Sequence, residues 1–329
     1  MDLALFTSET DDHVRKDIAW EGVLYGLDHG IANFRLAGWE EFPDQEKEAF
    51  VKTVLSLYAD KEDYDRAKIT QFFRQLFVEL TPDWQYKCLL LLYASWRGEI
   101  LQRAIGALQV LKSVWQALSE ENREEALQLL ASGLEGQKDA FTSREIVATL
   151  QLLHSKLNST QKEAMVNRYF EWLPGKDPDL TGGVLDAIRD ILEDYALEER
   201  ASIAAGKTVV IADLLNHKKL GVAMAAMRLV ELLFSSTGED AQSKFLAAAV
   251  RVLKNKDVQN YREIFLSLKN VWNRIAPHIL AEFAPKLHPM ILKLYHKRQT
   301  LEPTLSDAIE DFLEDFWEAL PDDLKDAYY

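Results

Sequence analysis

The chain has 329 residues, of which 48% are hydrophobic and 28% are charged, so it can bury a continuous core in one elongated domain or two ordinary ones. Its 14 glycines and 9 prolines are too few for a loop-rich or multi-stranded fold, and its single cysteine, Cys88, excludes an intrachain disulfide and a cysteine-based metal cluster. The formal net charge of −15 at pH 7 is unevenly distributed along the chain.

We expect neither a targeting segment nor a membrane segment in this chain. Its start, Met1-Asp2-Leu3, has no basic segment before an apolar run, so we expect no secretory signal. No stretch approaches the about 18 consecutive apolar residues of a membrane-spanning helix. We therefore expect a cytoplasmic protein without a membrane partner. Cys88 lies in the apolar segment 84–92, which favours a buried and inert thiol.

Nearly every segment of the chain places apolar residues at the spacing of an amphipathic helix. An N-terminal pair, at roughly 11–30 and 43–58, has an aromatic connection that contains Phe34, Trp39 and Phe42. After it, helix starts fall into two interleaved series with a period of about 40 residues. The first helices of successive pairs begin near residues 61, 98, 138, 180, 217, 257 and 304, and the second helices begin near 83, 120, 159, 197, 239 and 277.

Capping signals mark several of these starts. Thr81-Pro82 offers a capping side chain followed by proline at the first helical position. Thr142 with Glu145, and Thr160 with Glu163, have the spacing of a capping box. The only β-like triplet, 209–211, is followed by residues that continue a helical pattern, so we expect a helix there as well.

One literal repeat supports the period. The segment 186–195 matches 307–316 at seven of ten positions, and their offset of 121 residues is three periods of about 40. A period near 40 with two helices per unit resembles the HEAT-like and armadillo-like repeat proteins over residues 60 to 317, although no consensus Pro, Asp or Arg recurs at fixed positions.

The resemblance implies an all-α solenoid of antiparallel helix pairs, in which stacking makes the core continuous because one pair cannot bury its own apolar face. We expect an N-terminal helical cap at 1–60, helical repeats at 61–298, and an acidic capping helix and tail at 299–329. A pair of separate helical bundles is the rival architecture. Trp96, Trp115 and Trp272 fall in apolar stripes, which predicts that they pack in the core.

No catalytic constellation stands out in the sequence. Gly206-Lys207-Thr208 looks like the end of a phosphate-binding loop, but that loop needs a glycine where Ala201 stands and a preceding strand. None of the seven histidines forms a His-Glu-x-x-His motif, and we expect them at the surface or at helix caps. No serine has the context of a nucleophile elbow. We therefore predict binding rather than catalysis, with no cofactor and no metal.

Acidic side chains form the polar face of the helix predicted over 186–195. Asp186, Asp190, Glu193 and Asp194 lie at helical spacing, opposite the apolar residues of the same segment. This pattern favours a solvated helix face. An acidic docking surface and a metal site are the alternatives, but no histidine accompanies these carboxylates as it does in di-metal helical sites.

The charge changes sign along the chain. Residues 1–206 have a net charge of −14, residues 207–298 of +8, and residues 299–329 of −9. In the basic segment, cations recur once per helical repeat, which predicts a stripe that binds an anionic partner. The residues assigned to this stripe are Lys218, Lys219, Arg251, Lys254, Lys256, Arg274, Lys293, Lys297 and Arg298.

These cations could instead serve the chain itself, in either of two ways. Lys254, Lys256, Lys297 and Arg298 fall near predicted helix C-termini, where the helix dipole favours positive charge. The acidic segment 299–329 could also pack against the stripe and shield it from outside partners.

The leading functional hypothesis is a non-enzymatic interaction protein, such as an adaptor, inhibitor or scaffold, that binds a protein partner on the solenoid surface. The alternative is a nucleic-acid-binding HEAT-like protein, DNA repair included, that uses the segment 207–298, although the net charge of −15 opposes it. A third hypothesis is that the acidic region 1–206 mimics nucleic acid and occupies a basic protein. The terminal residues Tyr328 and Tyr329 could form a short docking tail.

Overall fold

The computed structural model describes residues 4–98, 100–136, 140–173, 178–255 and 261–325. Within these ranges every regular element is a helix, which confirms the all-α prediction. The chain divides into two compact units, unit 1 (residues 1–161) and unit 2 (residues 162–329). The division at 60 and 298, which rests on pattern and charge, stays a prediction. No helix of the described ranges is long and apolar enough to cross a membrane.

The helices of unit 1 are α1 (Ala4–Ser8), α2 (Asp12–His29), α3 (Ile31–Phe34), α4 (Asp44–Asp60), α5 (Asp63–Glu79), α6 (Pro82–Trp96), α7 (Leu101–Val114), α8 (Glu120–Gly136) and α9 (Ala140–Leu153). The boundary between the units falls inside α10 (Ser159–Trp172). The remaining helices are α11 (Pro178–Glu193), α12 (Leu197–Ile203), α13 (Thr208–Leu214), α14 (Leu220–Leu232), α15 (Glu239–Lys254), α16 (Tyr261–Trp272), α17 (Pro277–His296), α18 (Pro303–Ala319) and α19 (Asp322–Lys325). Short 3₁₀ or π-helical turns follow α3, α7, α9, α14 and α17.

The helix starts confirm the predicted period. The first helices of successive pairs, α5, α7, α9, α11, α14, α16 and α18, begin 38 to 42 residues apart. The second helices, α6, α8, α10, α12, α15 and α17, show the same spacing. In the fourth pair the second helix is split into α12 and α13, and α13 contains the β-like triplet in helical form, as expected.

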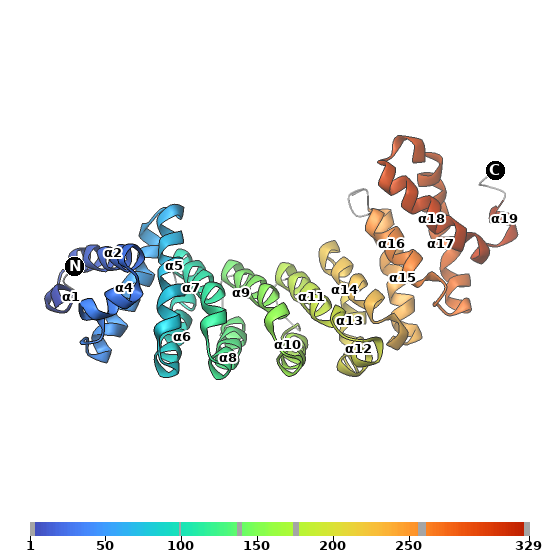
Figure 1. Ribbon diagram of the computed structural model, residues 1–329. Helices are drawn as coiled ribbons and strands as arrows, with labels where there is room; N and C mark the ends of the chain where they lie inside the picture. The colour runs from blue at the N-terminus through green and yellow to red at the C-terminus, as the bar shows by residue number, and fades with distance from the viewer. Residues whose placement is uncertain (1–3, 99, 137–139, 174–177, 256–260, 326–329) are drawn as a thin grey trace. The chain divides into compact units, whose positions relative to one another are not determined.

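Within each unit the helices form two rows (Figure 1). In unit 1, α5 packs on α7 and α7 on α9, while α6 packs on α8 in the other row. In unit 2, α11, α14, α16 and α18 pack in sequence to form the row of first helices, and α13, α15 and α17 form the other row. Equivalent faces of successive first helices therefore lie side by side, so their polar residues meet across the helix boundaries.

Apolar and aromatic side chains fill the space between the rows. Trp96, Trp115 and Trp272 are fully buried, which confirms their predicted core positions. Cys88 is also buried, as predicted, and desolvation raises the pKa of its thiol to about 12, which disfavours the reactive thiolate. In the N-terminal part of unit 1, aromatic rings from several elements pack together at edge-to-face or tilted angles: Phe6, Phe34, Trp39, Phe50 and Phe72.

A polar residue at the fourth position of most second helices connects neighbouring segments. Gln85 in α6 donates from Nε2 to the carbonyl oxygens of Phe77 and Ala117, each at 2.9 Å, and accepts from the Ser119 backbone N–H at 3.1 Å. Arg123 in α8 donates from Nε to the Trp115 carbonyl at 3.1 Å. These side chains satisfy backbone groups that helix ends would otherwise leave unpaired.

The equivalent positions in unit 2 are used in the same way. Gln242 in α15 accepts at Oε1 from the Ala276 backbone N–H at 3.0 Å, in the turn that precedes α17. Arg200 in α12 donates to backbone carbonyls at the end of α11. The fourth position of most second helices is therefore polar, although its residue type changes between glutamine, arginine and, at Lys162, lysine. For this reason no single recurring residue type marks the position in the sequence.

Two of the predicted helix caps are wrong in position, whereas the third is confirmed. Thr81 caps α6, and its Oγ1 accepts from the Trp84 backbone N–H. Thr160, however, lies inside α10, where Asn158 and Gln161 exchange the reciprocal bonds of the capping box. Thr142 lies inside α9, which begins at Ala140. At α10 the reciprocal bonds of Asn158 and Gln161 already cap the helix two residues before Thr160.

One histidine also departs from the expected surface position. His288 in α17 is buried, and desolvation lowers its pKa, although a backbone hydrogen bond with Leu324 acts in the opposite direction. Among the described residues, no group of three or more histidine, cysteine, aspartate or glutamate side chains is placed to hold a metal ion.

A glycine sets how closely α7 approaches α4. A Cβ at Gly106 would fall well inside van der Waals distance of the Tyr58 ring. Tyr58 is itself buried and its hydroxyl is hydrogen-bonded to Thr70, so the ring cannot easily move away. Gly182 in α11 has no atom within 4 Å of the corresponding Cβ position. An alanine side chain would therefore clash at Gly106 but not at Gly182.

We expect Gly106→Ala to destabilise the protein by about 1–3 kcal/mol, because the overpacking against Tyr58 exceeds the gain in helix propensity. Gly182→Ala should instead stabilise it by up to about 1 kcal/mol, since only the propensity changes. Urea unfolding followed by circular dichroism measures both. Equal effects of the two substitutions would contradict the close packing of α4 and α7.

Candidate functional site

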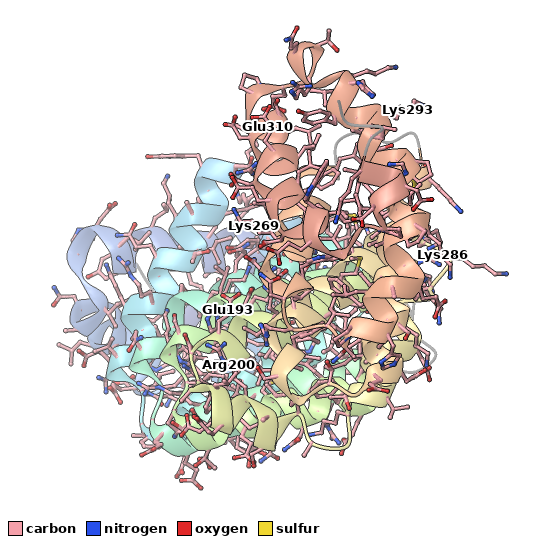
Figure 2. The ribbon with its side chains drawn as sticks, turned by 90° about the vertical axis from the view of Figure 1, so that its right-hand side faces the viewer. Glu193, Arg200, Lys269, Lys286, Lys293 and Glu310 are labelled. Carbon is pink, nitrogen blue, oxygen red and sulfur yellow. The ribbon has the colours of Figure 1, made fainter. Side chains whose placement is uncertain are left out.

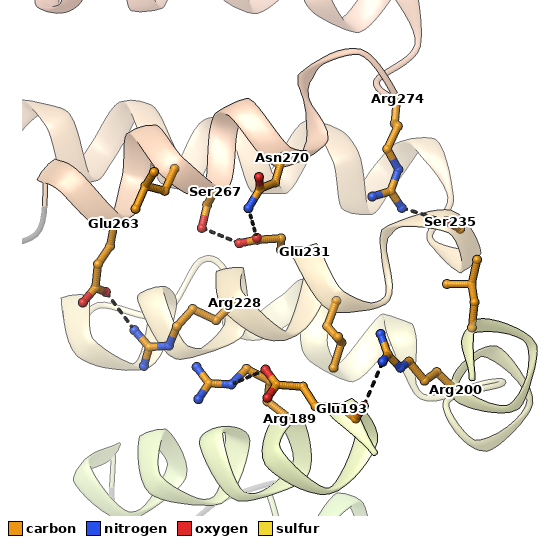
Figure 3. Close-up of a pocket in the computed structure, with 13 residues that line it drawn as sticks. Arg189, Glu193, Arg200, Arg228, Glu231, Ser235, Glu263, Ser267, Asn270 and Arg274 are labelled. Carbon is orange, nitrogen blue, oxygen red and sulfur yellow. Dashed lines mark hydrogen bonds and ion pairs between the residues drawn. The ribbon is translucent and has the colours of Figure 1, made fainter. Parts of the chain in front are cut away.

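Unit 2 contains a groove of about 780 Å³ on the row of its first helices (Figure 3). Its walls come from α11, α12, α14 and α16, so three successive repeats contribute to it. Four arginines, three glutamates, three leucines, two serines and an asparagine line it: Arg189, Glu193, Leu197, Arg200, Arg228, Glu231, Leu232, Ser235, Glu263, Leu266, Ser267, Asn270 and Arg274.

Two of the four arginines are neutralised by carboxylates. Arg228 in α14 binds both carboxylate oxygens of Asp186 in α11, at 2.8 and 3.0 Å from Nη2, and also Glu263 in α16 at 3.1 Å. Arg189 lies 2.8 Å from Asp190 and 3.3 Å from Glu193. Partial burial disfavours its charge, but the hydrogen bond to Asp190 and the nearby carboxylates together raise the pKa of Arg189.

These ion pairs tie three first helices together, because Arg228 bridges α11 and α16. The acidic face of residues 186–194, which the sequence favoured as solvated, is therefore largely committed to ion pairs. Asp194 also pairs with Lys162 at 2.6 Å. The contact of Arg228 with both carboxylate oxygens of Asp186 holds its guanidinium group in one orientation.

The centre of the groove carries a carboxylate with neutral partners. Glu231 in α14 accepts from the Ser267 hydroxyl at 2.5 Å and from the Asn270 side-chain amide at 2.6 Å. Both donors are on α16, so this contact is a second bridge between neighbouring first helices. Neither donor carries a charge, so the negative charge of Glu231 is not cancelled by these contacts.

The end of the groove where the first helices finish carries two arginines without a carboxylate partner among the described residues (Figure 3). Arg200 donates to the backbone carbonyls of Tyr195 and Glu193 at 2.7 and 2.9 Å. Arg274 donates to the Ser235 hydroxyl at 2.7 Å and lies over the Phe234 ring at 5.1 Å. Both guanidinium groups are therefore positioned by neutral partners.

Leucines complete the walls of the groove. Leu197 in α12 is 48% exposed and Leu266 in α16 is 37% exposed. Leu232 in α14 lies half-buried in the same groove. Single exposed leucines are ordinary on protein surfaces, but three that line one polar groove provide apolar contact area beside fixed hydrogen-bonding groups.

Most of the predicted anion-binding residues lie at one edge of unit 2, where second helices end and first helices begin. Lys218 and Lys219 precede α14, Arg251 and Lys254 end α15, and the other three residues of this edge are Lys293, Lys297 and Arg298 at the end of α17. Figure 2 shows Lys286 and Lys293 on α17, apart from Glu193 and Arg200. Arg274 lies at the opposite edge, in the groove, and Lys256 lies outside the described residues.

Several of these cations serve contacts within the chain. Arg251 donates to the Leu215 and Asn216 carbonyls at the end of α13. Arg298 pairs with Glu310 in α18 at 3.0 Å and lies over the Tyr295 ring. The acidic segment 299–329 thus contacts the basic segment at Arg298, and Asp311 pairs with Lys269 in α16 at 3.0 Å.

The remaining cations of this edge are exposed. Lys218, Lys254, Lys293 and Lys297 have no ion pair or hydrogen bond from their side chains to other described residues. We call these four the basic edge. Arg262, at the start of α16, is also exposed and was not in the predicted set. That all these residues bind an anionic partner stays a prediction.

The groove was not predicted from the sequence, although two of its residues, Glu193 and Arg274, were singled out there for other reasons. Arg189 and Arg228 occupy ordinary polar positions of amphipathic helices, and nothing in their spacing marks them. One signal did point to the region: the repeated segments 186–195 and 307–316 belong to α11 and α18, and both use their acidic faces to bind a neighbouring first helix. A repeated charged face was therefore a sign of contacts between repeats.

Comparison with known proteins supports the fold. No protein-family model matches the chain, and a search of curated proteins found no match. Among solved structures, 127 chains match. Kap121p, in its crystal structure bound to RanGTP, superposes with a TM-score of 0.61 over 95% of this chain at 11% sequence identity. A crystallised engineered protein matches 96% of this chain and 98% of its own length, with 14% identity and a TM-score of 0.45.

The match to Kap121p, a HEAT-repeat karyopherin, confirms a HEAT-like helical fold. The aligned part is 33% of Kap121p, so this chain spans about a third of the length of that protein. At this level of identity the likeness concerns the fold alone.

We expect the Arg228–Asp186 pair to show a coupling energy of about 1 kcal/mol in a double-mutant cycle of Arg228→Gln and Asp186→Asn, because its geometry is bidentate and partly buried. The exposed i, i+4 pair of Lys286 and Glu282 in α17 is the control. Its coupling should stay below about 0.5 kcal/mol. Urea unfolding measures both cycles, and a coupling no larger than that of the control would show that Arg228 does not join the first helices.

Proposed function

We propose that this protein is a non-enzymatic interaction protein that binds a segment of a protein partner in the groove between α11, α12, α14 and α16. The observation that carries the proposal is the composition of the groove. Leucines on three walls stand beside side chains that neighbouring repeats hold in fixed orientations. A surface ordered in advance loses little conformational freedom when a partner binds.

The fold supports a binding role in a general way. Helical repeats bury a continuous core and leave extended surfaces, and such surfaces serve mainly for contact with other macromolecules. Kap121p, which has this fold, was crystallised bound to RanGTP. The groove itself is open and is lined by residues that suit contact with a peptide, namely guanidinium, carboxylate and amide groups around leucine side chains.

Selection of peptides from a random display library against the full chain tests this proposal. We expect the selected peptides to bind Leu197→Glu and Leu266→Glu at least tenfold more weakly, because burying one leucine contributes about 1.5–3 kcal/mol. Val209→Glu is the matched control, since Val209 in α13 is 65% exposed and does not line the groove. Circular dichroism confirms that each variant is folded.

The proposal fails if no peptide is enriched, or if the selected peptides bind both groove variants as well as they bind the parent chain. Weaker binding to Val209→Glu alone would place the binding surface on another face of unit 2.

A second candidate function is nucleic-acid binding at the basic edge. The observation that favours it is the difference between the lysines of this edge and others in unit 2. Lys162, Lys244, Lys269 and Lys286 are each ion-paired, whereas the four lysines of the basic edge have no carboxylate partner among the described residues. Exposed lysines that recur from repeat to repeat suit contacts to phosphates.

Fluorescence anisotropy with a labelled DNA duplex tests this candidate. We expect affinity at low salt that falls steeply as the salt concentration rises, and that falls at least tenfold when the four lysines of the basic edge are replaced by glutamine. The control variant replaces the four paired lysines by glutamine and so has the same net charge. Absence of binding at low salt, or equal loss in both variants, excludes this function.

A further inference from the structure

We infer that the groove recognises an acidic residue of its partner, and that Arg200 and Arg274 bind its carboxylate. This inference rests on the proposed function and names the chemistry of the segment that the groove accepts. Its basis is the contrast between the two ends of the groove, which have the same residue type in different surroundings (Figure 3).

At one end of the groove the two arginines, Arg189 and Arg228, are already paired with carboxylates of the chain. Arg228 faces Asp186 and Glu263, and Arg189 faces Asp190 and Glu193, so a further anion would compete with carboxylates that are held in place. A partner carboxylate gains little there. This end ties the repeats together rather than offering charge to a ligand.

At the other end the charges are positioned but not neutralised. A guanidinium group has five N–H donors, of which Arg200 uses two and Arg274 uses one in contacts to other described residues. The carbonyls at the end of α11 attract Arg200 only through the partial charge of a helix C-terminus. Each guanidinium therefore keeps most of its charge and several donors for a carboxylate.

The two arginines are also ordered before any partner arrives. Two backbone carbonyls hold Arg200, and a hydroxyl together with the face of a buried ring, Phe234, holds Arg274. Planar guanidinium groups that are fixed in this way lose little entropy on binding a carboxylate. Ser235, which orients Arg274, lies between the two arginines in Figure 3.

The centre of the groove argues for a peptide over a polyanion. Glu231 keeps its negative charge in the same groove as the two arginines, because its partners Ser267 and Asn270 are neutral. A strand with a phosphate at every step would place negative charge against Glu231. A peptide can place one acidic side chain at the arginines, an uncharged hydrogen-bond donor at Glu231, and an apolar side chain on the three leucines of the groove.

The test compares two fluorescein-labelled peptides by anisotropy, with the full chain as the binding protein. The first peptide comes from the groove-dependent set of the display selection, and the second has the same sequence except that each Asp and Glu is replaced by Asn or Gln. We expect the acidic peptide to bind at least tenfold more tightly than its neutral counterpart. We expect Arg274→Gln to reduce this preference to less than threefold while the affinity of the neutral peptide stays the same.

Two further variants test whether a change in peptide preference comes from loss of a groove charge, from a general loss of positive charge, or from a disturbed fold. Lys286→Gln removes an exposed cation from α17 and should leave the preference unchanged. Arg200→Gln should act as Arg274→Gln does, but because Arg200 also caps α11, its effect is used only if circular dichroism and urea unfolding show a native fold. Rising salt should weaken the acidic peptide more than the neutral one.

The inference is overturned if the two peptides bind equally, or if Arg274→Gln leaves the preference intact, while Leu266→Glu still abolishes binding. In that case the groove remains a binding site without acidic specificity. If neither peptide depends on Leu197 or Leu266, the proposed function itself fails. A labelled single-stranded oligonucleotide that binds more tightly than the acidic peptide, and in an Arg274-dependent way, would also overturn the peptide assignment.

Discussion

Each helix pair of this chain carries apolar side chains on the faces that it turns toward its neighbours, and no pair can bury them alone. This constraint governs the rest of the structure. It requires that equivalent helices pack side by side at a constant period, which is why first helices and second helices both recur every 38 to 42 residues. Two helices can approach closely only where small side chains face each other's bulky ones, as Gly106 in α7 faces Tyr58 in α4.

The same constraint explains how charged residues are used. Polar faces of successive first helices become neighbours, so arginines and carboxylates from different repeats come within ion-pairing distance. Arg228 bridges α11 and α16, and Lys269 binds Asp311 across α16 and α18. Pairs at the surface contribute little energy individually. Their effect in unit 2 is to hold a set of side chains in one arrangement along the groove.

The groove therefore combines two kinds of arginine that the sequence does not distinguish. Arg189 and Arg228 are neutralised by neighbouring helices, whereas Arg200 and Arg274 are held by backbone carbonyls, a hydroxyl and an aromatic face. The two kinds of arginine differ only in the groups that each guanidinium contacts. The groove is therefore ordered and partly apolar, and at one end its arginines have no carboxylate partner among the described residues.

The amino-acid sequence by itself determined the local features of this protein. Apolar spacing predicted the helices and their period, the tryptophan stripes predicted core positions, and the apolar context of Cys88 predicted a buried thiol, because each of these depends on neighbours within a few residues. Contacts between residues about 40 apart decided the rest. Gln85 and Arg228 bind residues of neighbouring repeats, His288 is hydrogen-bonded to the backbone of Leu324, and three successive repeats line the groove. Such contacts depend on the packing angle and register of whole helices, which no local pattern specifies. Only the tertiary structure therefore decided which charged side chains are paired within the chain and which have no carboxylate partner among the described residues.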